Sequence, residues 1–283
     1  MGGGNFAGSM ANISFFFPSA SKGYALGLNA GLGHLGVALV QLVVPVAIGV
    51  GLFGGTSQGT AAQPLWLQNA GFVWVPLILA SAVAAWFGMD DLAGAKAGFA
   101  EQAVIFTRKH NWLMCWLYVG SFGSFIGFSA GLPMLLHNQF GQGAASDADL
   151  LHLAWVGPLV GALMRPWGGW LADHFGGARV SFWAFCALAM GVLALLPCLP
   201  RSGQGGSLPG FLAVFALLFS ASGIANGSTF RMIPSIFLAE RLRAADPLPS
   251  AQAQAARQGQ VEAAAVLGFA SAIGAYGGFF IPK

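Results

Sequence analysis

The chain has 283 residues, of which 56% are apolar and only 7% are charged, with a formal net charge of +3. A soluble domain carries about 25% charged residues, so these proportions exclude a water-soluble protein and indicate a surface that mostly faces lipid. The 12 basic residues form no run that could follow a nucleic-acid backbone, which excludes a nucleic-acid partner. The sequence therefore predicts an all-α, polytopic membrane protein in a lipid bilayer.

Seven segments are long and apolar enough to cross a membrane, which takes about 20 mostly apolar residues. A further apolar stretch, residues 2–18, is short and is typical of the second half of a helix. The last span ends where the chain ends, so both ends look cut, and we expect a fragment of a longer transporter. The seven predicted spans cover 24–53, 71–89, 112–136, 152–172, 179–199, 209–238 and 261–281.

The basic residues predict the orientation, because cytoplasmic loops carry an excess of Lys and Arg. One alternate set of connections holds eight of them and the other set holds two, Arg201 and Lys283. We therefore expect an inner-membrane protein whose connections at 54–70, 137–151 and 200–208 face outward. The eight residues predicted to be cytoplasmic are Lys22, Lys96, Arg108, Lys109, Arg179, Arg241, Arg243 and Arg257.

The segment GLNAGLGHLGVAL, residues 27–39, contains G-x-G-x-x-G, the pattern that binds phosphates in dinucleotide enzymes. Such a site needs an acidic residue about 20 positions later, and none lies between Gly36 and Met89. Upstream, Pro18 interrupts the strand that the pattern requires. The three cysteines lack the spacing of a metal site. We therefore expect neither a nucleotide cofactor nor a metal.

On a helix this segment has two bare faces. Asn29, Gly33 and Gly36 fall within a 60° stripe, and Gly27 and Gly31 lie nearly opposite. One face can let a neighbouring helix approach closely, and the other can line a narrow pathway beside the Asn29 amide. Alternatively, both faces only pack.

The same segment has a counterpart near the end of the chain. A shift of 241 residues lays it over GFASAIGAYGGFF, where Gly33 meets Gly274 and Gly36 meets Gly277. Two glycine helices separated by five spans of sequence predict a transporter made of two similar halves.

Arg165 lies well inside a predicted span, where a charge costs at least about 2.5–3.5 kcal/mol and marks function by default. No Asp or Glu lies near the middle of any predicted span. The planar fork of a guanidinium suits a small planar oxyanion, although a snorkelling arginine is the alternative. Arg231 lies nearer the end of its span, which favours snorkelling or a structural contact between helices.

Three further residues are candidates for the walls of an anion site. Tyr118 and Phe122 are four positions apart and share a helix face, so they either pack or flank a flat anion. His34 is either a polar packing residue or a titratable group that modulates binding.

The segments GGGNFAGSMANISFFFP, ALGLNAGLGHLGVALVQL, LYVGSFGSFIGFSAG, ANGSTFRMIP and AAAVLGFASAIGAYGGFFIPK closely resemble the nitrate/nitrite porters of the major facilitator superfamily. The resemblance covers nearly the whole chain. It implies twelve helices in two halves, with alternating access and a substrate held between the halves. The chain would then contain part of helix 4 and helices 5 to 11, with the first half ending in 1–89, an inter-half loop at 90–111 and the second half at 112–283.

The resemblance also implies roles for individual residues. Arg165 matches the substrate arginine of the eighth helix, and its partner arginine belongs to the second helix, which this chain lacks. Tyr118 and Phe122 match aromatic residues that line the site, while the two glycine segments match the nitrate signatures of the fifth and eleventh helices. His34 stands where the first signature usually has Asn. The substrate-binding set expected from residues and resemblance together is Arg165, Tyr118, Phe122, Asn29, Gly33, Gly36, Gly274 and Gly277.

The expected function is nitrate/nitrite exchange by a monomeric transporter that is not an enzyme and needs no cofactor. Proton-coupled nitrate symport is the alternative within transporters, although the predicted spans hold no buried carboxylate for a proton relay. A membrane oxidoreductase would need several histidines inside spans, and only His34 lies well inside one. A non-transporting fragment or a membrane sensor remains the alternative from another class.

Overall fold

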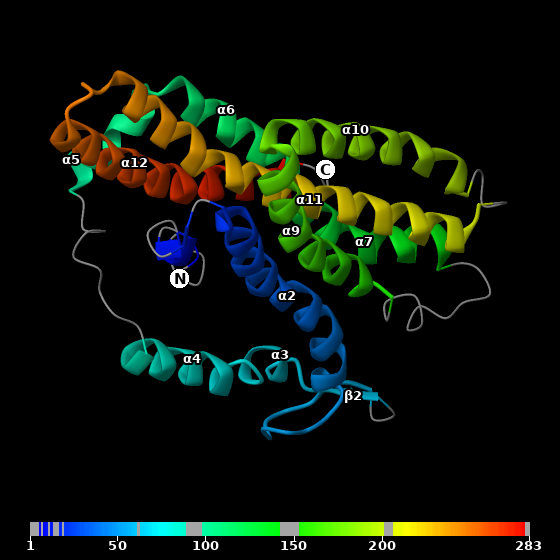
Figure 1. Ribbon diagram of the computed structural model, residues 1–283. Helices are drawn as coiled ribbons and strands as arrows, with labels where there is room; N and C mark the ends of the chain where they lie inside the picture. Colours follow the sequence, from blue (N-terminus) through cyan, green and yellow to red (C-terminus); the bar gives the residue numbers. More distant parts are fainter. Residues whose placement is uncertain are drawn as a thin grey trace.

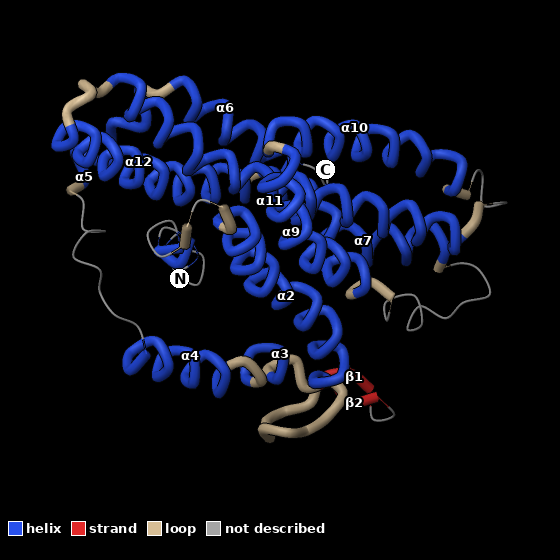
Figure 2. The backbone as a smooth tube through the Cα atoms, viewed as in Figure 1, coloured by secondary structure: helices blue, strands red, loops and turns tan. Residues whose placement is uncertain are grey.

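The computed structural model describes residues 6, 8–10, 12, 13, 17, 18, 20–60, 63–88, 98–141, 153–200 and 206–280. Over these residues the protein is a bundle of long helices with one short antiparallel hairpin (Figures 1 and 2). Several predictions lie outside the described residues: most of the segment 2–18, the loop residues 89–97 with Lys96, the parts 142–152 and 201–205 of two connections, and the end at Lys283.

The helices alternate with short connections along the chain. The two strands pair through Gln58 with Leu65, Gly59 with Pro64 and Thr60 with Gln63. The elements, in chain order, are α2 (Lys22–Ile48), β1 (Gln58–Thr60), β2 (Gln63–Leu65), α3 (Asn69–Phe72), α4 (Val75–Gly88), α5 (Phe99–Ala103), η2 (Val104–Thr107), α6 (Lys109–Tyr118), η3 (Val119–Gly123), α7 (Ser124–Phe140), α9 (Val156–Phe175), α10 (Gly177–Leu195), η4 (Leu196–Cys198), α11 (Leu208–Ala244), α12 (Pro249–Ala275) and α13 (Gly277–Phe280).

Six helical segments of the described chain are long and apolar enough to cross a membrane. They confirm six of the seven predicted spans, and the protein is therefore a multi-pass membrane protein. The seventh prediction, 152–172, forms α9, a helix of 20 residues that is long enough to span but carries Arg165 and Asp173. The six segments are Lys22–Ile48, Asn69–Gly88, Lys109–Phe140, Gly177–Cys198, Leu208–Ala244 and Pro249–Phe280.

The centre of the bundle is formed by α9, which packs between α2 and α11 (Figure 1). On the other side of α11 lie α10 and α12, and α12 also contacts α6. Aromatic side chains fill much of the interior, because a buried phenyl ring contributes a large apolar area. The fully buried phenylalanines include Phe125, Phe211, Phe219, Phe230 and Phe237. Helix α4 lies away from this bundle and has no buried residue.

Glycines allow the close contact of α2 with α9. A Cβ atom on Gly27 would lie 2.5 Å from the carbonyl oxygen of Arg165, and one on Gly31 would lie 2.6 Å from that of Ala162. Real Cβ atoms essentially never approach an atom so closely, so only glycine fits at either position. The face of α2 that carries Gly27 and Gly31 is therefore a packing face, as small-residue faces of membrane helices often are.

Candidate functional site

Arg165 occupies the interior of the bundle, in the middle of α9, and has no exposed surface. Its guanidinium carbon lies 4.5 Å from the ring centre of Phe125 and 5.5 Å from that of Phe122. Its Nη1 atom lies 2.9 Å from Nδ1 of His34. Among the described residues no carboxylate pairs with Arg165, and its Nε and Nη2 atoms have no hydrogen-bond partner.

Two helices fix the backbone of Arg165. Gly27 of α2 lies against the carbonyl group of Arg165 on one side, and Gly227 of α11 lies against the same carbonyl on the other. A side chain at either glycine would collide with that oxygen. The backbone is thus clamped between α2 and α11, while the side chain extends towards the phenyl rings of Phe122 and Phe125.

The two unpaired nitrogen atoms of Arg165, Nε and Nη2, are arranged so that they can bind one anion together. The Nε and Nη2 groups lie side by side on one edge of the planar guanidinium and point two N–H bonds in parallel. This edge can hold two oxygens of one planar oxyanion at once, which gives both a strong interaction and a fixed orientation. Burial keeps water from competing for the same donors, and the attraction between opposite charges is stronger in such an interior than in water.

Tyr118 contributes a second polar group to this site. Its ring is fully buried and stacks on Phe122, with ring centres 5.1 Å apart and an angle of 25° between the planes. The hydroxyl lies beside Arg165, Asn226 and Ser271, yet it forms no hydrogen bond of normal distance and angle within the described chain. A buried hydroxyl without a partner is costly, and it is therefore available to a ligand.

The turn that follows Tyr118 is a π-helix, the element η3, Val119–Gly123. Such wide turns inside α-helices frequently lie at functional sites. Side chains satisfy two of its carbonyl groups: Ser124 Oγ donates to that of Gly120 at 2.6 Å, and Ser222 Oγ of α11 donates to that of Ser121 at 2.8 Å. The sequence analysis missed this turn, although the two glycines of GSFG, Gly120 and Gly123, were a signal of irregular backbone.

The structure brings together five of the residues singled out in the sequence. Arg165, His34, Phe122 and Tyr118 form one contiguous cluster, and Gly274 of α12 lies against the Tyr118 ring, where a Cβ atom would collide with it. His34 contacts Phe122 edge to face, with ring centres 5.0 Å apart. Gly277, by contrast, packs on the backbone of η3 at Gly123.

The second face of α2, which carries Asn29, Gly33 and Gly36 and was predicted to line a pathway, points away from Arg165. The Nδ2 group of Asn29 donates to Ser9 Oγ at 3.0 Å and to Met10 Sδ at 3.1 Å. A Cβ atom on Gly33 or on Gly36 would meet no atom of the described chain within 4 Å. Whether this face lines the substrate path stays a prediction.

Two residues of the site were not anticipated from the sequence. Phe125 contacts the guanidinium more closely than Phe122 does, and its position three residues further along the same helix was a signal that could have found it. Asn226 is fully buried on α11 and was inconspicuous in the stretch ANGSTF, where small and polar residues surround it.

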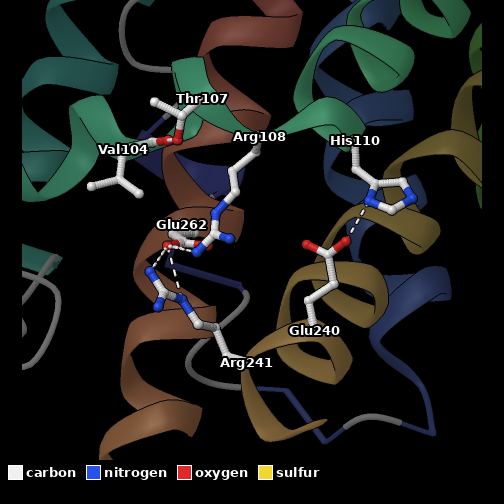
Figure 3. Close-up of polar contacts among 7 residues, drawn as sticks. All are labelled: Val104, Thr107, Arg108, His110, Glu240, Arg241 and Glu262. Carbon is white, nitrogen blue, oxygen red and sulfur yellow. Dashed lines mark hydrogen bonds and ion pairs between the residues drawn. The ribbon is translucent and has the colours of Figure 1, made fainter. Parts of the chain in front are cut away.

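Charged side chains of α11, α12 and the start of α6 form ion pairs (Figure 3). Glu262 of α12 is almost fully buried and binds both Arg108, at 3.1 Å from Nη2, and Arg241, at 3.0 Å from Nε. His110 pairs with Glu240 beside them. These contacts join α12 and α6 to α11 at the bundle end that is predicted to face the cytoplasm. Glu262 lies inside the predicted span 261–281, so the expectation that the predicted spans hold no buried carboxylate was wrong.

A similar contact joins α2 to α9. The carboxylate of Asp173 accepts backbone N–H bonds from Gly23 at 3.2 Å and from Tyr24 at 3.0 Å, and it pairs with Arg231. The carboxylate stabilises the N-terminus of α2, where backbone N–H groups have no partner within their own helix. Arg231 therefore makes a structural contact between helices, one of the two roles expected of it.

The fold and this site define a multi-pass membrane protein with a buried cation at its centre that no carboxylate of the described chain pairs. No protein-family model matches the chain. The nitrate/nitrite transporter NarU of Salmonella typhimurium is 47% identical over 285 residues, and NarU of Escherichia coli is 45% identical over 286 residues; each match covers 99% of this chain and 60% of the relative. The probable nitrate/nitrite antiporter NarK2 of Thermus thermophilus is 39% identical over 288 residues.

These similarities extend over nearly every residue of the chain, which spans about 60% of the length of the relatives it matches. Over nearly all of its length the chain is similar to proteins named nitrate/nitrite transporters and antiporters, in agreement with the resemblance of its motifs to the nitrate/nitrite porters of the major facilitator superfamily.

Proposed function

We propose that the protein transports nitrate and nitrite across the inner membrane by alternating access, and that it exchanges one anion for the other. The names of the relatives support the choice of substrates. In this proposal residues 1–89 belong to the first half of a monomeric transporter, 90–111 form the inter-half loop and 112–283 belong to the second half.

The observation that carries the proposal is the state of Arg165. A buried guanidinium stays charged, and a buried charge needs a counter-charge nearby. Within the described chain no carboxylate supplies one, while the free Nε and Nη2 edge matches two oxygens of a planar anion. The rings of Phe122 and Phe125 bound the site with flat apolar surfaces that exclude water from a flat ligand.

Exchange fits this site better than proton symport. A bound anion neutralises Arg165, so the site is expected to change its exposure more easily when loaded than when empty, which is the behaviour of an exchanger. In the described chain His34 and Tyr118 are the titratable groups beside the guanidinium, and no carboxylate lies there. Symport through this site would therefore require one of these two groups, or a segment beyond those described, to carry the proton.

The test is Arg165→Lys in the full-length gene product, purified and reconstituted in vesicles loaded with nitrite. A lysine keeps the charge but offers a point donor instead of the parallel pair, so uptake of ¹⁵N-nitrate should fall about 10- to 100-fold at low nitrate concentration. Arg231→Lys is the matched control, because a lysine can still pair with Asp173. Normal uptake by Arg165→Lys would contradict the proposal, and acidification of the lumen during uptake would favour symport.

A further inference from the structure

Gln41 of α2 forms a hydrogen bond with the backbone of α7 on the predicted outer side of Arg165. Its Nε2 group donates to the carbonyl oxygen of Ser129 at 2.8 Å, while its Oε1 atom is buried and has no partner in the described chain. Burying an amide is costly unless the amide is paired, so the place of this side chain needs an explanation. The proposed contact between Arg165 and the anion does not use it.

The explanation lies in the carbonyl group of Ser129, which has lost its regular donor. In an α-helix the carbonyl of residue 129 accepts from the N–H group of residue 133. In α7 that residue is Pro133, which has no N–H group. Ser129 is buried, so its carbonyl needs a partner within the protein. Gln41 supplies that partner from another helix.

The place of this hydrogen bond relative to the anion site follows from the two helices. Gln41 lies seven residues after His34, which is two turns and about 10 Å along the same face of α2. Ser129 lies four residues after Phe125, on the same face of α7. The rings of His34 and Phe125 are in contact, with centres 5.7 Å apart. The hydrogen bond from Gln41 to Ser129, here called the outer contact, therefore joins α2 to α7 outward of Arg165.

The inner side of the site has a contact of its own. There Asp173 of α9 accepts backbone N–H bonds from Gly23 and Tyr24 of α2. In the proposed transporter α2 belongs to the first half, and α7 and α9 belong to the second. The two contacts thus join the halves on both sides of Arg165, which has no exposed surface. Along α2 the site is closed towards both sides.

We propose that the outer contact closes the site towards the outside and breaks when the site opens to take up an anion from there. The inference rests on the proposed function, because it describes how the two halves separate. In the closed state the Ser129 carbonyl and the Gln41 amide are shielded from water and satisfy each other. In the outward-open state water enters between α2 and α7 and replaces the broken hydrogen bond.

The experiment measures how fast a cysteine behind the outer contact reacts with a membrane-impermeant maleimide. The full-length gene product carries Val37→Cys, one turn inward of Gln41 on α2, and its native cysteines are replaced. Gln41→Met keeps the approximate shape of the side chain but leaves the Ser129 carbonyl unpaired in the closed state. Labelling in right-side-out vesicles should become about tenfold faster, and labelling in inside-out vesicles should not become faster.

Gln68→Met is the matched control for the loss of a glutamine amide. The Nε2 group of Gln68 also donates to a backbone carbonyl, that of Gly54 at 2.9 Å, but both residues belong to the proposed first half. This variant should leave both labelling rates unchanged. If Gln41→Met does not fold, Gln41→Ala removes the donor without a steric conflict and should show the same one-sided change.

Pro133→Ala separates the outer contact from a general packing effect. An alanine at this position supplies the missing N–H group, so the Ser129 carbonyl no longer depends on Gln41. In the Pro133→Ala background, Gln41→Met should therefore speed outside labelling less than about threefold. An unchanged outside rate, equal increases from both sides, or the same tenfold effect in both backgrounds would overturn the inference. Wild-type vesicles that transport neither nitrate nor nitrite would refute the proposed function, whereas the labelling rates would still decide whether the outer contact closes the site.

Discussion

His34 lies between two groups that compete for one of its nitrogen atoms. Nδ1 is 2.7 Å from the carbonyl oxygen of Ala30 and 2.9 Å from Nη1 of Arg165. Since a carbonyl only accepts and a guanidinium only donates, a neutral imidazole can form only one of these hydrogen bonds at a time. Edge contacts with Phe122 and Phe125 hold the ring in place. His34 therefore helps to fix Arg165 only when Nδ1 keeps its lone pair.

This arrangement predicts different effects for two substitutions of His34. His34→Asn retains a group that can accept from Nη1 of Arg165, so the KM for nitrate should stay within about threefold of the wild-type value. His34→Leu removes the acceptor, loosens the guanidinium and should raise that KM about five- to tenfold. Uptake kinetics in reconstituted vesicles measure both. Equal KM values for the two variants would show that the hydrogen bond to Arg165 has no part in binding.

The glycine motif of α2 contributes to two faces of the helix, and these two faces have different surroundings. The face with Gly27 contacts α9 so closely that a Cβ atom would lie 2.5 Å from the Arg165 carbonyl, whereas nothing in the described chain lies within 4 Å of a Cβ atom on Gly33. Glycine is a poor helix former, and replacing it by alanine stabilises a helix by about 1 kcal/mol where there is room. The two positions therefore respond to the same substitution in opposite ways.

We predict that Gly27→Ala lowers the thermal unfolding midpoint of the purified full-length protein in detergent, because it forces α2 away from α9 at a cost of about 1–3 kcal/mol. Gly33→Ala, on the same helix, should leave the midpoint unchanged or raise it. If Gly33→Ala also impairs nitrate uptake, the predicted pathway along Asn29, Gly33 and Gly36 gains support. Equal stability of the two variants would contradict the packing described for α2.

The sequence predicted the regular helices well and the irregular backbone segments poorly. Long apolar runs identified six spans, since hydrophobic length alone decides whether a helix can cross a bilayer. The lone charge of Arg165 stood out against such a background. The hairpin of β1 and β2 was expected only as a polar connection, because strands of three residues are too short to show a periodic pattern.

The contacts around Arg165 could be predicted only in part from the spacing of residues in the sequence. Tyr118 and Phe122 were paired correctly by their four-residue separation, but the π-helical turn that shifts their neighbours leaves no periodic trace in the sequence. The carbonyl of Ser121, which accepts a hydrogen bond from Ser222 of α11, lies about 100 positions earlier in the chain, and only packing of the folded chain brings the two together. Contacts of this range depend on tertiary structure and lie beyond local patterns.

For the molecule as a whole, the ion pairs gather at one end of the bundle. Asp173 binds the first residues of α2, and Glu262 binds Arg108 and Arg241. The excess of basic residues predicts that this end faces the cytoplasm and that the hairpin end faces outward.

Labelling with a membrane-impermeant maleimide tests this orientation in a full-length protein whose native cysteines have been replaced. Ser57, beside β1, and Ser250, in the first turn of α12, are both exposed, so each cysteine can react when the reagent reaches it. Ser57→Cys should be labelled in intact cells, and Ser250→Cys only after the membrane is permeabilised. The reverse pattern would show that the charge count gave the wrong orientation.

The π-helical turn also affects how this protein is compared with others, and with itself. A π turn closes its hydrogen bonds over five residues instead of four, so it adds one residue to a helix that is otherwise regular. The spanning segment Lys109–Phe140 therefore loses phase with a plain α-helix between Tyr118 and Ser124. An alignment of this helix with a regular helix of the other half needs a one-residue gap at that point, and without the gap the aromatic residues on its two sides are matched to the wrong partners.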